Sequence, residues 1–440
     1  MNRYDSYKDS GVEWIGEIPS TWEKRKFKWD IFYQEGPGLR TFQFTESGVR
    51  VICVSNITEH GIDFETTHTR HISQKEYEEK YKHFTVKNRD ILLSSSGSIG
   101  KVSRYFFDGE PVILNTSTIR IHSSNENYYL DDFVPYVLSS NYIQIQLRFL
   151  MTGGIVSNFG PSHLDQLFNY IPTLSEQNQI VSFLDTKTSL IDSLIEKTKR
   201  KIELLKEKRT SLINEVVTKG LNTNVEMKDS GVEWIGKIPS HYQFGKLKHL
   251  CKENQRSLPN SVDPYYELNY IEISDVNSEG VIGNPTPYVF SESPSRCRRI
   301  VQKGDVIVST VRTYLKSIGL IEEEVEDLIC STGFSVLTPN NEINSKYLFY
   351  LLRTEWFISM VISKSEGVSY PSIQSEKLMN IDVVYCELSE QQQIVSYLDE
   401  HTQLIDKTIS VEKRRIDTLK EYRQSLISEV VTGKLDVRLN

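Results

Sequence analysis

The sequence is poor in cysteine and has no long hydrophobic run, and each shortage excludes a class of protein. Its 440 residues contain five cysteines, an odd number that are never paired at a metal-ligand spacing. We therefore expect reduced thiols and neither a disulfide framework nor a zinc site. No apolar stretch approaches the roughly 18 residues of a membrane-spanning helix, and the N-terminus lacks a basic and apolar signal segment. We expect a cytoplasmic protein.

Motifs for nucleotide or cofactor chemistry are incomplete. Residues 97–101 resemble the tail of a phosphate-binding loop, but Ser95 replaces the leading glycine and Val102 replaces the hydroxyl that would bind magnesium. Residues 284–288 resemble the Asn-Pro-Pro-aromatic loop of amino-methyltransferases, yet an inserted threonine breaks the spacing and no glycine-rich cofactor loop accompanies it. We interpret this second segment as a proline turn.

Metal and nucleophile motifs are equally weak. His68 and His71 have a spacing that can chelate, but no cysteine or third histidine lies nearby in the sequence. No Gly-x-Ser-x-Gly turn and no His-Glu-x-x-His pair occurs. We therefore predict that the chain is not an enzyme and binds no metal or cofactor of its own.

The net charge is unfavourable for one common function. A formal charge of −8 argues against a protein that coats nucleic acid unaided, because such binding depends on neutralised phosphates. Specific binding through a local basic face stays open. Two short basic runs would form such a face or simply be solvated: Lys24, Arg25, Lys26 and Lys28, and later Arg296, Arg298 and Arg299.

What the chain does contain is a long repeat. Residues 174–218 read LSEQNQIVSFLDTKTSLIDSLIEKTKRKIELLKEKRTSLINEVVT, and residues 388–432 read LSEQQQIVSYLDEHTQLIDKTISVEKRRIDTLKEYRQSLISEVVT. The copies align without a gap, and about 29 of some 45 positions are identical. Apolar residues recur every three and four positions, which predicts a heptad helix of roughly 65 Å in each copy.

Each predicted helix has a start, an end and an apolar seam. Ser175 and Ser389 can cap the N-termini, and Gly220 and Gly433 can end the helices. So long a seam needs a partner, and two matching helices in one chain can pair with each other. The predicted helix-pairing residues are Leu184, Ile191, Ile195, Ile202, Leu205, Leu212 and Val216, with Leu398, Ile405, Ile409, Ile416, Leu419, Leu426 and Val430 as their counterparts.

Polar residues interrupt this seam at matching positions. Thr198 and Glu412 occupy core positions near the middle of each copy, and Arg209 and Arg423 occupy core positions nearer its end. Polar core residues can set the register of paired helices. We therefore predict that the two helices run antiparallel about a pseudo-two-fold axis near Thr198 and Glu412. Two helices in separate bundles are the alternative.

A second repeat shows that the whole chain is duplicated. Residues 8–20 read KDSGVEWIGEIPS and residues 228–240 read KDSGVEWIGKIPS. Each half therefore starts with this opening segment and ends with a heptad helix. The rings of Trp14 and Trp234 are predicted to be apolar anchors for the opening segments.

Between the opening segment and the helix, the two halves align only in patches. Short apolar runs predict three matched strands, at 51–55 with 270–274, 90–94 with 305–309, and 115–121 with 330–337. Helical patterns follow at 131–150 and 345–361, and loops at 153–161 and 363–371. Each variable part is therefore predicted to be a mixed α+β domain. Nearly identical helices beside divergent domains indicate one shared frame that carries two different readers.

The order of these parts carries a family resemblance. An opening segment with Ile-Pro, a variable domain, and a helix that runs from SEQ-x-QIVS-(F/Y)-LD to SLI-x-EVVT, all present twice, resembles the specificity subunit of a Type I restriction-modification system. The resemblance covers essentially the whole chain. It implies an α+β fold with two target recognition domains, residues 1–173 and 222–387, and two conserved antiparallel spacer helices, residues 174–221 and 388–440.

The resemblance also implies a function and partners. In that family each recognition domain reads one half of a split, non-palindromic site in double-stranded DNA, and the paired helices fix the distance between the half-sites. The helices dock two modification subunits, which use S-adenosylmethionine to methylate adenine. Restriction subunits, with ATP and magnesium, join this core to cleave DNA. A two-lobed protein-binding scaffold without DNA specificity and a DNA-modifying enzyme in its own right are the alternatives.

Polar loops after the second matched strand, and the later loops, are the predicted DNA contacts. Arginine and lysine suit guanine, asparagine suits adenine and hydroxyls suit either base. The alternative is that these are turn residues satisfied within their own loops. The predicted residues are Ser95, Ser96, Ser98, Lys101, Arg104, Ser157 and Asn158 in the first half, and Thr310, Arg312, Tyr314, Lys316, Ser369 and Tyr370 in the second.

Overall fold

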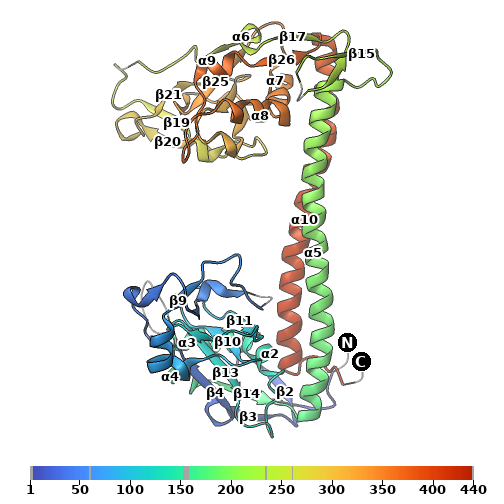
Figure 1. Ribbon diagram of the computed structural model, residues 1–440. Coiled ribbons are helices and arrows are strands. Elements are labelled where there is room, and N and C mark those ends of the chain that lie inside the picture. The colour runs from blue at the N-terminus through green and yellow to red at the C-terminus, as the bar shows by residue number, and fades with distance from the viewer. Residues whose placement is uncertain (1–2, 59–60, 152–157, 233–234, 260, 439–440) are drawn as a thin grey trace. The chain divides into compact units, whose positions relative to one another are not determined.

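The chain divides into two compact units, each with one globular domain and one end of each of two long helices (Figure 1). Unit 1 comprises residues 1–198 and 414–440, and unit 2 comprises residues 199–413. The structure is a computed structural model that describes residues 3–58, 61–151, 158–232, 235–259 and 261–438. No helix among the described residues is both long and apolar enough to cross a bilayer.

The two long repeats form the longest elements, α5 (Leu174–Lys219) and α10 (Leu388–Val431). Gly220 and Gly433 follow close behind them with φ angles of +73° and +71°. This left-handed conformation is the one that glycine adopts most readily and that commonly ends a helix. Both predicted helices and both predicted ends are confirmed.

The predicted N-caps are wrong, because both serines lie inside the first helical turn. In α5 the residue before the helix takes that role: the Thr173 hydroxyl accepts the Glu176 amide at 3.3 Å, and the Thr173 amide donates to the Glu176 carboxylate at 3.0 Å. In α10 the corresponding residue is Glu387, whose carbonyl accepts the Gln391 amide and whose carboxylate accepts the Ser389 hydroxyl. The N-cap positions therefore lie two residues earlier than expected.

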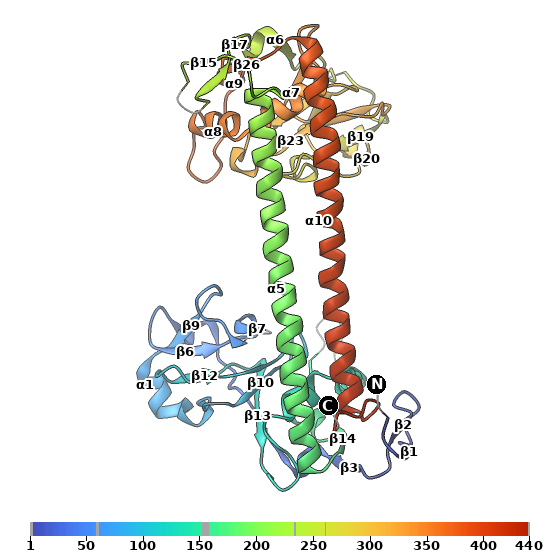
Figure 2. The same ribbon diagram turned by 90° about the vertical axis from the view of Figure 1, so that its right-hand side faces the viewer.

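Within each unit the two helices pack antiparallel. In unit 1 the start of α5 lies beside the end of α10 (Figure 2), and Arg423 Nε donates to Asp192 at 2.9 Å. In unit 2 the end of α5 lies beside the start of α10, and Arg209 Nε lies 3.1 Å from Asp406. The antiparallel direction is confirmed. Thr198 belongs to unit 1 and Glu412 to unit 2. The predicted proximity of these two residues therefore stays a prediction.

The predicted seam residues are buried or half-buried throughout. Thr198 and Glu412 are also buried, and the Thr198 hydroxyl donates to the Leu194 carbonyl one turn earlier at 2.7 Å. Half-burial is limited to Leu205, Leu212, Ile416 and Leu419, and the buried seam residues are Leu184, Ile191, Ile195, Ile202, Val216, Leu398, Ile405, Ile409, Leu426 and Val430.

Each globular domain contains two four-stranded sheets. In unit 1 the first sheet has the order β4 (Ile31–Glu35), β13 (Thr118–Ser123), β10 (Ile91–Ser94), β11 (Val102–Arg104). The second has the order β12 (Val112–Leu114), β6 (Val49–Ile52), β9 (Arg70–Ile72), β5 (Phe44–Thr45). All pairs in these sheets are antiparallel except β6 with β12, which is parallel.

Unit 2 repeats this arrangement. Its first sheet has the order β18 (Cys251–Glu253), β25 (Phe334–Pro339), β22 (Val306–Ser309), β23 (Ile318–Leu320). The second has the order β21 (Cys297–Ile300), β24 (Leu328–Ser331), β19 (Glu267–Ile271), β20 (Thr286–Val289), again with one parallel pair, β19 with β24. The second sheets share three strands, and their fourth strands lie at opposite edges.

The predicted strands and helices are present with shifted bounds. The run 330–337 covers the end of β24 and the start of β25, so it is two strands and not one. Each predicted helix is broken into two: α2 (Val134–Ser139) and α3 (Asn141–Leu150) in unit 1, and α7 (Ser345–Leu352) and α8 (Glu355–Ser363) in unit 2. Ser140 causes the first break, because its hydroxyl caps α3 by accepting the Ile143 amide.

Short elements complete each unit. Trp14 is 39% exposed, and its ring centroid lies 5.6 Å from that of Tyr142. Trp22 is fully buried and is therefore the stronger apolar anchor of the opening segment. Trp234 lies outside the described residues. The remaining strands and α-helices are β1 (Tyr7–Asp9), β2 (Glu17–Pro19), β3 (Glu23–Lys26), β7 (Ile57–Thr58), β8 (Gly61–Ile62), α1 (Gln74–Glu76), α4 (Pro161–Leu164), β14 (Phe168–Ile171), β15 (Met227–Asp229), β16 (Lys237–Pro239), β17 (Gln243–Lys246), α6 (Leu247–Leu250), α9 (Ser375–Met379) and β26 (Asp382–Tyr385).

Candidate nucleic-acid interface

Two loops that the sequence selected in the first half lie side by side in unit 1. The loop between β10 and β11 and the loop before α4 meet through a bridge between Ser96 and Asn158, and the Phe159 amide donates to the Ser95 carbonyl at 3.1 Å. Ser98, Lys101 and Asn158 are exposed. Ser157 lies outside the described residues.

The same two loops meet in unit 2. Val311, in the loop between β22 and β23, bridges to Ser372, and the Arg312 amide donates to the Pro371 carbonyl at 2.7 Å. The Arg312 guanidinium lies 4.8 Å from the centre of the Tyr370 ring, a cation–π contact that holds the charge at the surface. The structure therefore brings the predicted residues of this half together with Ser369 and Tyr370, which are both exposed.

Backbone strain marks the loop of unit 2. Arg312 and Lys316 flank the one-turn helix η8 (Thr313–Leu315), and both have left-handed φ angles, +50° and +58°. Residues with a Cβ rarely adopt this conformation, and such strain is concentrated at functional sites. Both side chains and that of Tyr314 are exposed, so the strain holds two cations and an aromatic ring at the surface.

Several predicted residues are engaged within the fold. The Ser96 hydroxyl donates to the Ser117 hydroxyl at 2.7 Å, and Lys101 Nζ donates to the Ile57 carbonyl at 3.4 Å. Three others are engaged more fully. Ser95 is only 2% exposed, and the Thr310 hydroxyl donates to the Gly333 carbonyl at 2.9 Å. Arg104 lies at the far end of β11 from the loop, where it pairs with Asp132 at 2.7 Å and donates to the Asp131 carbonyl at 2.9 Å. A direct DNA contact by these three side chains stays a prediction that this geometry disfavours.

Unit 1 contains a pocket that the predicted residues only partly describe. Its volume is about 320 Å³, and six of its nine lining residues have polar side chains. The lining residues are Cys53, Val54, Ser55, His68, Arg70, Ser96, Gly97, Asn115 and Ser117. Of these, only Ser96 is among the predicted DNA contacts. His68 and Arg70 belong to a His-Thr-Arg-His run, whose spacing suggests a weak metal motif and gives no sign of a base reader.

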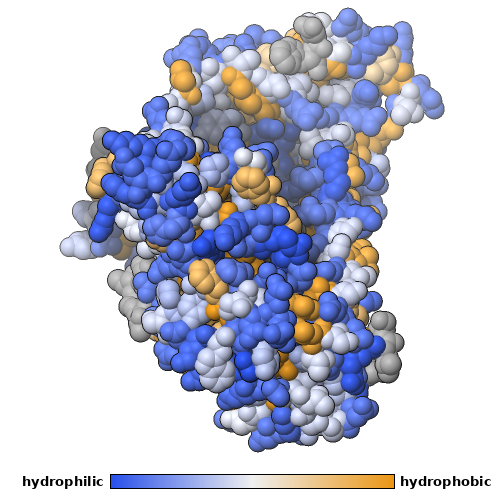
Figure 3. Space-filling model, turned by 60° about the horizontal axis from the view of Figure 1, so that its bottom comes forward, coloured by the Kyte–Doolittle hydropathy of each residue, from blue (hydrophilic) through white to orange (hydrophobic). Residues whose placement is uncertain are grey.

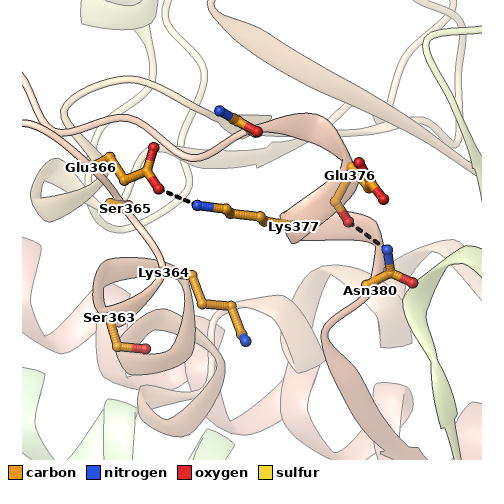
Figure 4. A pocket seen from close by; sticks show the side chains of 8 residues that line it. Ser363, Lys364, Ser365, Glu366, Glu376, Lys377 and Asn380 are labelled. Carbon is orange, nitrogen blue, oxygen red and sulfur yellow. Dashed lines mark hydrogen bonds and ion pairs between the residues drawn. The ribbon is translucent and has the colours of Figure 1, made fainter.

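Unit 2 has a shallow polar pocket beside its later loop (Figure 4). Its volume is about 510 Å³, and it is lined by Lys364, which directly follows α8, by Glu366 in the loop and by Lys377 on α9. Lys377 forms an ion pair with Glu366, and the Asn380 amide donates to the Glu376 carbonyl at 2.9 Å.

A buried glutamine fastens each domain to its long helix. Gln177 is fully buried in the first turn of α5, donates to the carbonyls of Tyr128 and Pro172 at 2.6 and 3.1 Å, and accepts the Leu130 amide at 2.9 Å. Gln391 in α10 makes the same set of bonds, to the Glu342 and Cys386 carbonyls and the Asn344 amide. This glutamine of the repeated LSEQ motif therefore positions each domain.

The charge of one carboxyl beside the unit 1 loops is disfavoured. Glu35, at the end of β4, lies next to Gly160, and burial raises the pKa of its carboxyl above the ordinary value. The face drawn in Figure 3 is mostly hydrophilic, with its apolar side chains in small separate groups. A surface of this kind suits a polar ligand better than an apolar one.

Two domains that share a sheet framework and differ in their surface loops define a duplicated recognition protein. The chain belongs to the family described as Type I restriction modification DNA specificity domain, whose family model matches residues 19–204 and again residues 239–421. Each half therefore carries one DNA specificity domain of a type I restriction-modification specificity subunit.

Relatives along most of the chain have the same description. The chain is 23% identical to the Type I restriction enzyme MjaVIII specificity subunit of Methanocaldococcus jannaschii over 372 residues, 81% of each chain. It is 20% identical to the StySPI specificity subunit of Salmonella potsdam over 385 residues, 84% of this chain and 80% of that one.

Solved structures show the same fold. A chain from a structure of a type I R-M system, described for its complex assembly and conformational transition, has a TM-score of 0.68 at 16% identity and covers 95% of this chain and 99% of that chain. The HsdS subunit of Thermoanaerobacter tengcongensis has a TM-score of 0.52 at 15% identity, with 97% and 100% covered.

Proposed function

We propose that each globular domain reads one half of a split, asymmetric DNA site, and that α5 and α10, which both run through the two units, fix the spacing between the half-sites. One internal comparison supports this most directly. Units 1 and 2 keep the same order in their first sheets, but the loops that follow β10 and β22 differ in residue type, charge and backbone conformation. Two different readers on one frame suit a non-palindromic site.

The long helices offer two equivalent surfaces for partner subunits. Leu190 in unit 1 and Leu404 in unit 2 are matching residues of the repeat, and they are 57% and 65% exposed. Neither the fold nor the helix seam requires leucine at such a position. An exposed leucine retained in both copies supports docking of two copies of one partner, which we propose to be the modification subunit.

In this proposal the partner subunits, and not this chain, catalyse DNA methylation and cleavage. Among the described residues no cluster of three histidine, cysteine or acidic side chains could hold a metal ion. We propose that this chain is non-catalytic and acts in the cytoplasm. S-adenosylmethionine would bind to the modification subunits, and ATP and magnesium would serve the restriction subunits. We propose that the recognition domains comprise residues 1–173 and 222–387 and that the spacer helices comprise residues 174–221 and 388–440.

Mapping of methylated adenines at single-molecule resolution tests the proposal. DNA is taken from cells that express the chain with its neighbouring methyltransferase and from cells that lack only this chain. We expect a split, asymmetric motif that disappears without the chain. Methylation that is identical in the two strains would contradict the proposed reading function.

A further inference from the structure

The duplication allows the polar pocket of unit 1 to be compared with the matching place in unit 2. In each unit a strand of the second sheet leads into a one-turn helix whose third residue accepts a backbone amide, Asn56 at 2.8 Å and Asp275 at 2.7 Å. Because these turns are equivalent, Val54 corresponds to Ile273.

A second pair of hydrogen bonds fixes the rest of the correspondence. The Ser95 amide donates to the Ser117 carbonyl at 2.9 Å, and the Thr310 amide donates to the Gly333 carbonyl at 2.8 Å. The next residue in each loop forms the bridge to the later loop. The correspondence therefore pairs Ser117 with Gly333 and Ser96 with Val311.

In unit 2 this place is filled by apolar side chains. A Cβ atom added to Gly333 would lie 2.5 Å from Ile273 Cδ1 and 3.3 Å from Val311 Cγ2. Both side chains therefore cover the glycine, which is the residue type that leaves them room. A DNA base edge has no polar group to meet at this point of unit 2.

In unit 1 the same place is a pocket of about 320 Å³, in which Ser96 and Ser117 replace Val311 and Gly333 and which His68 and Arg70 also line. The Ser96 hydroxyl donates to the Ser117 hydroxyl at 2.7 Å, so each serine keeps further hydrogen-bonding capacity for a ligand. The exposed Arg70 guanidinium lies 4.7 Å from the centre of the Phe44 ring. This cation–π contact restricts the orientation of the guanidinium. None of the ion pairs found among the described residues includes Arg70.

Hydrogen bonds from the buried Asn56 hold the segment that carries His68 and Arg70. Asn56 is fully buried, and its side-chain amide donates to the Asp63 carbonyl at 3.1 Å and to the Thr67 hydroxyl at 2.7 Å. The Asp63 carboxylate in turn accepts two backbone amides, each at 2.9 Å. A segment held in this way can present side chains to a ligand with little loss of conformational entropy.

We propose that this pocket is the base-reading site of the first domain and that Arg70 reads a guanine there, with His68 and Ser96 at the same base step. Arginine presents two parallel donors that match the O6 and N7 acceptors of guanine in the major groove, a match that no other base offers. The inference rests on the proposed function, because it assumes that the unit 1 domain reads one half-site.

Methylation mapping of Arg70→Ala, in the complex with the methyltransferase, tests the assignment. We expect about tenfold to hundredfold weaker discrimination for guanine at one position of one half-site, with the other half-site and the spacer unchanged. Ser96→Val, which installs the residue of the other domain, should alter the same half-site, and Arg312→Ala should alter only the other half-site. A motif that is unchanged in Arg70→Ala, or weakened equally in both half-sites, would overturn the assignment.

Cys53 gives a second measurement that needs no variant. This thiol lines the pocket and is half-buried, whereas the other four are buried. In the wild-type complex, a duplex with the mapped site should protect Cys53 from alkylation, and among duplexes in which each guanine of the site is replaced in turn, one should protect it less. Equal protection by all of these duplexes would refute the proposal even if Arg70→Ala failed to fold. Loss of the whole motif when the chain is absent tests the proposed function separately.

Discussion

The carboxylate of Asp192 accepts two hydrogen bonds from the Arg423 guanidinium, at 2.9 and 3.2 Å. The same pair recurs in unit 2 with the copies exchanged, because Arg209 corresponds to Arg423 and Asp406 corresponds to Asp192. In a parallel arrangement equivalent residues would meet, so aspartate would face aspartate and arginine would face arginine. The repeated pair therefore favours the antiparallel direction and penalises the parallel one.

A double-mutant cycle measures this contribution. Asp192→Ala and Arg423→Ala should each lower the free energy of unfolding by about 1 kcal/mol, because the pair is bidentate but half-exposed. The charge-exchanged variant Asp192→Arg with Arg423→Asp should recover most of that loss. Thermal unfolding of the full chain is the measurement, and purely additive effects of the two single substitutions would argue against a direct interaction.

The buried glutamines make a second prediction. Gln177→Leu leaves two carbonyls and one amide without a partner inside the protein, and each buried unsatisfied group costs about 1–3 kcal/mol. We expect a clear loss of thermal stability, and the same loss for Gln391→Leu. Gln179→Leu and Gln393→Leu are matched controls, because these exposed residues lie two positions further along each helix. Similar stability of Gln177→Leu and Gln179→Leu would contradict the positioning role.

Two substitutions of Arg312, whose backbone is left-handed, can separate an effect on stability from an effect on DNA discrimination. Arg312→Gly removes the strain of a side chain at φ +50° and should raise the stability of unit 2 by about 1 kcal/mol. It also removes the cation over Tyr370, so discrimination at the second half-site should fall. Arg312→Ala keeps the strain and should lose discrimination without gaining stability. A stability gain of the same size in both variants would show that the backbone angle is not its cause.

The cysteines provide a test by pH. Burial raises the pKa of the Cys251 and Cys386 thiols to about 12, so at pH 8 only about one in ten thousand is the reactive thiolate. Iodoacetamide at pH 8 should therefore label Cys53 first in the native chain and all five thiols after denaturation. Mass spectrometry of digested samples gives the order of labelling, and Cys251 or Cys386 labelled as fast as Cys53 would contradict the burial.

The parts predicted well from the sequence are those determined by local periodicity. The heptad seam was visible because burial along a helix repeats every three and four residues, and the matched strands were visible as short apolar runs. The N-caps were missed because Thr173 and Ser175 have the same chemistry and only the structure shows which carbonyl accepts the first helical amide. The pocket was missed because His68, Ser96 and Ser117 come from three separate segments of the chain.

The length of the helices makes the last prediction. Insertion of four residues into both α5 and α10 lengthens each by about 6 Å, close to two base-pair steps of 3.4 Å. If these helices fix the spacing between half-sites, the preferred spacer should become longer while both half-site sequences stay the same. Insertion into α5 alone is the control, because it breaks the register with α10 and should abolish the motif. Methylation mapping measures both, and an unaltered spacer in the double insertion would exclude the helices as the element that sets the distance.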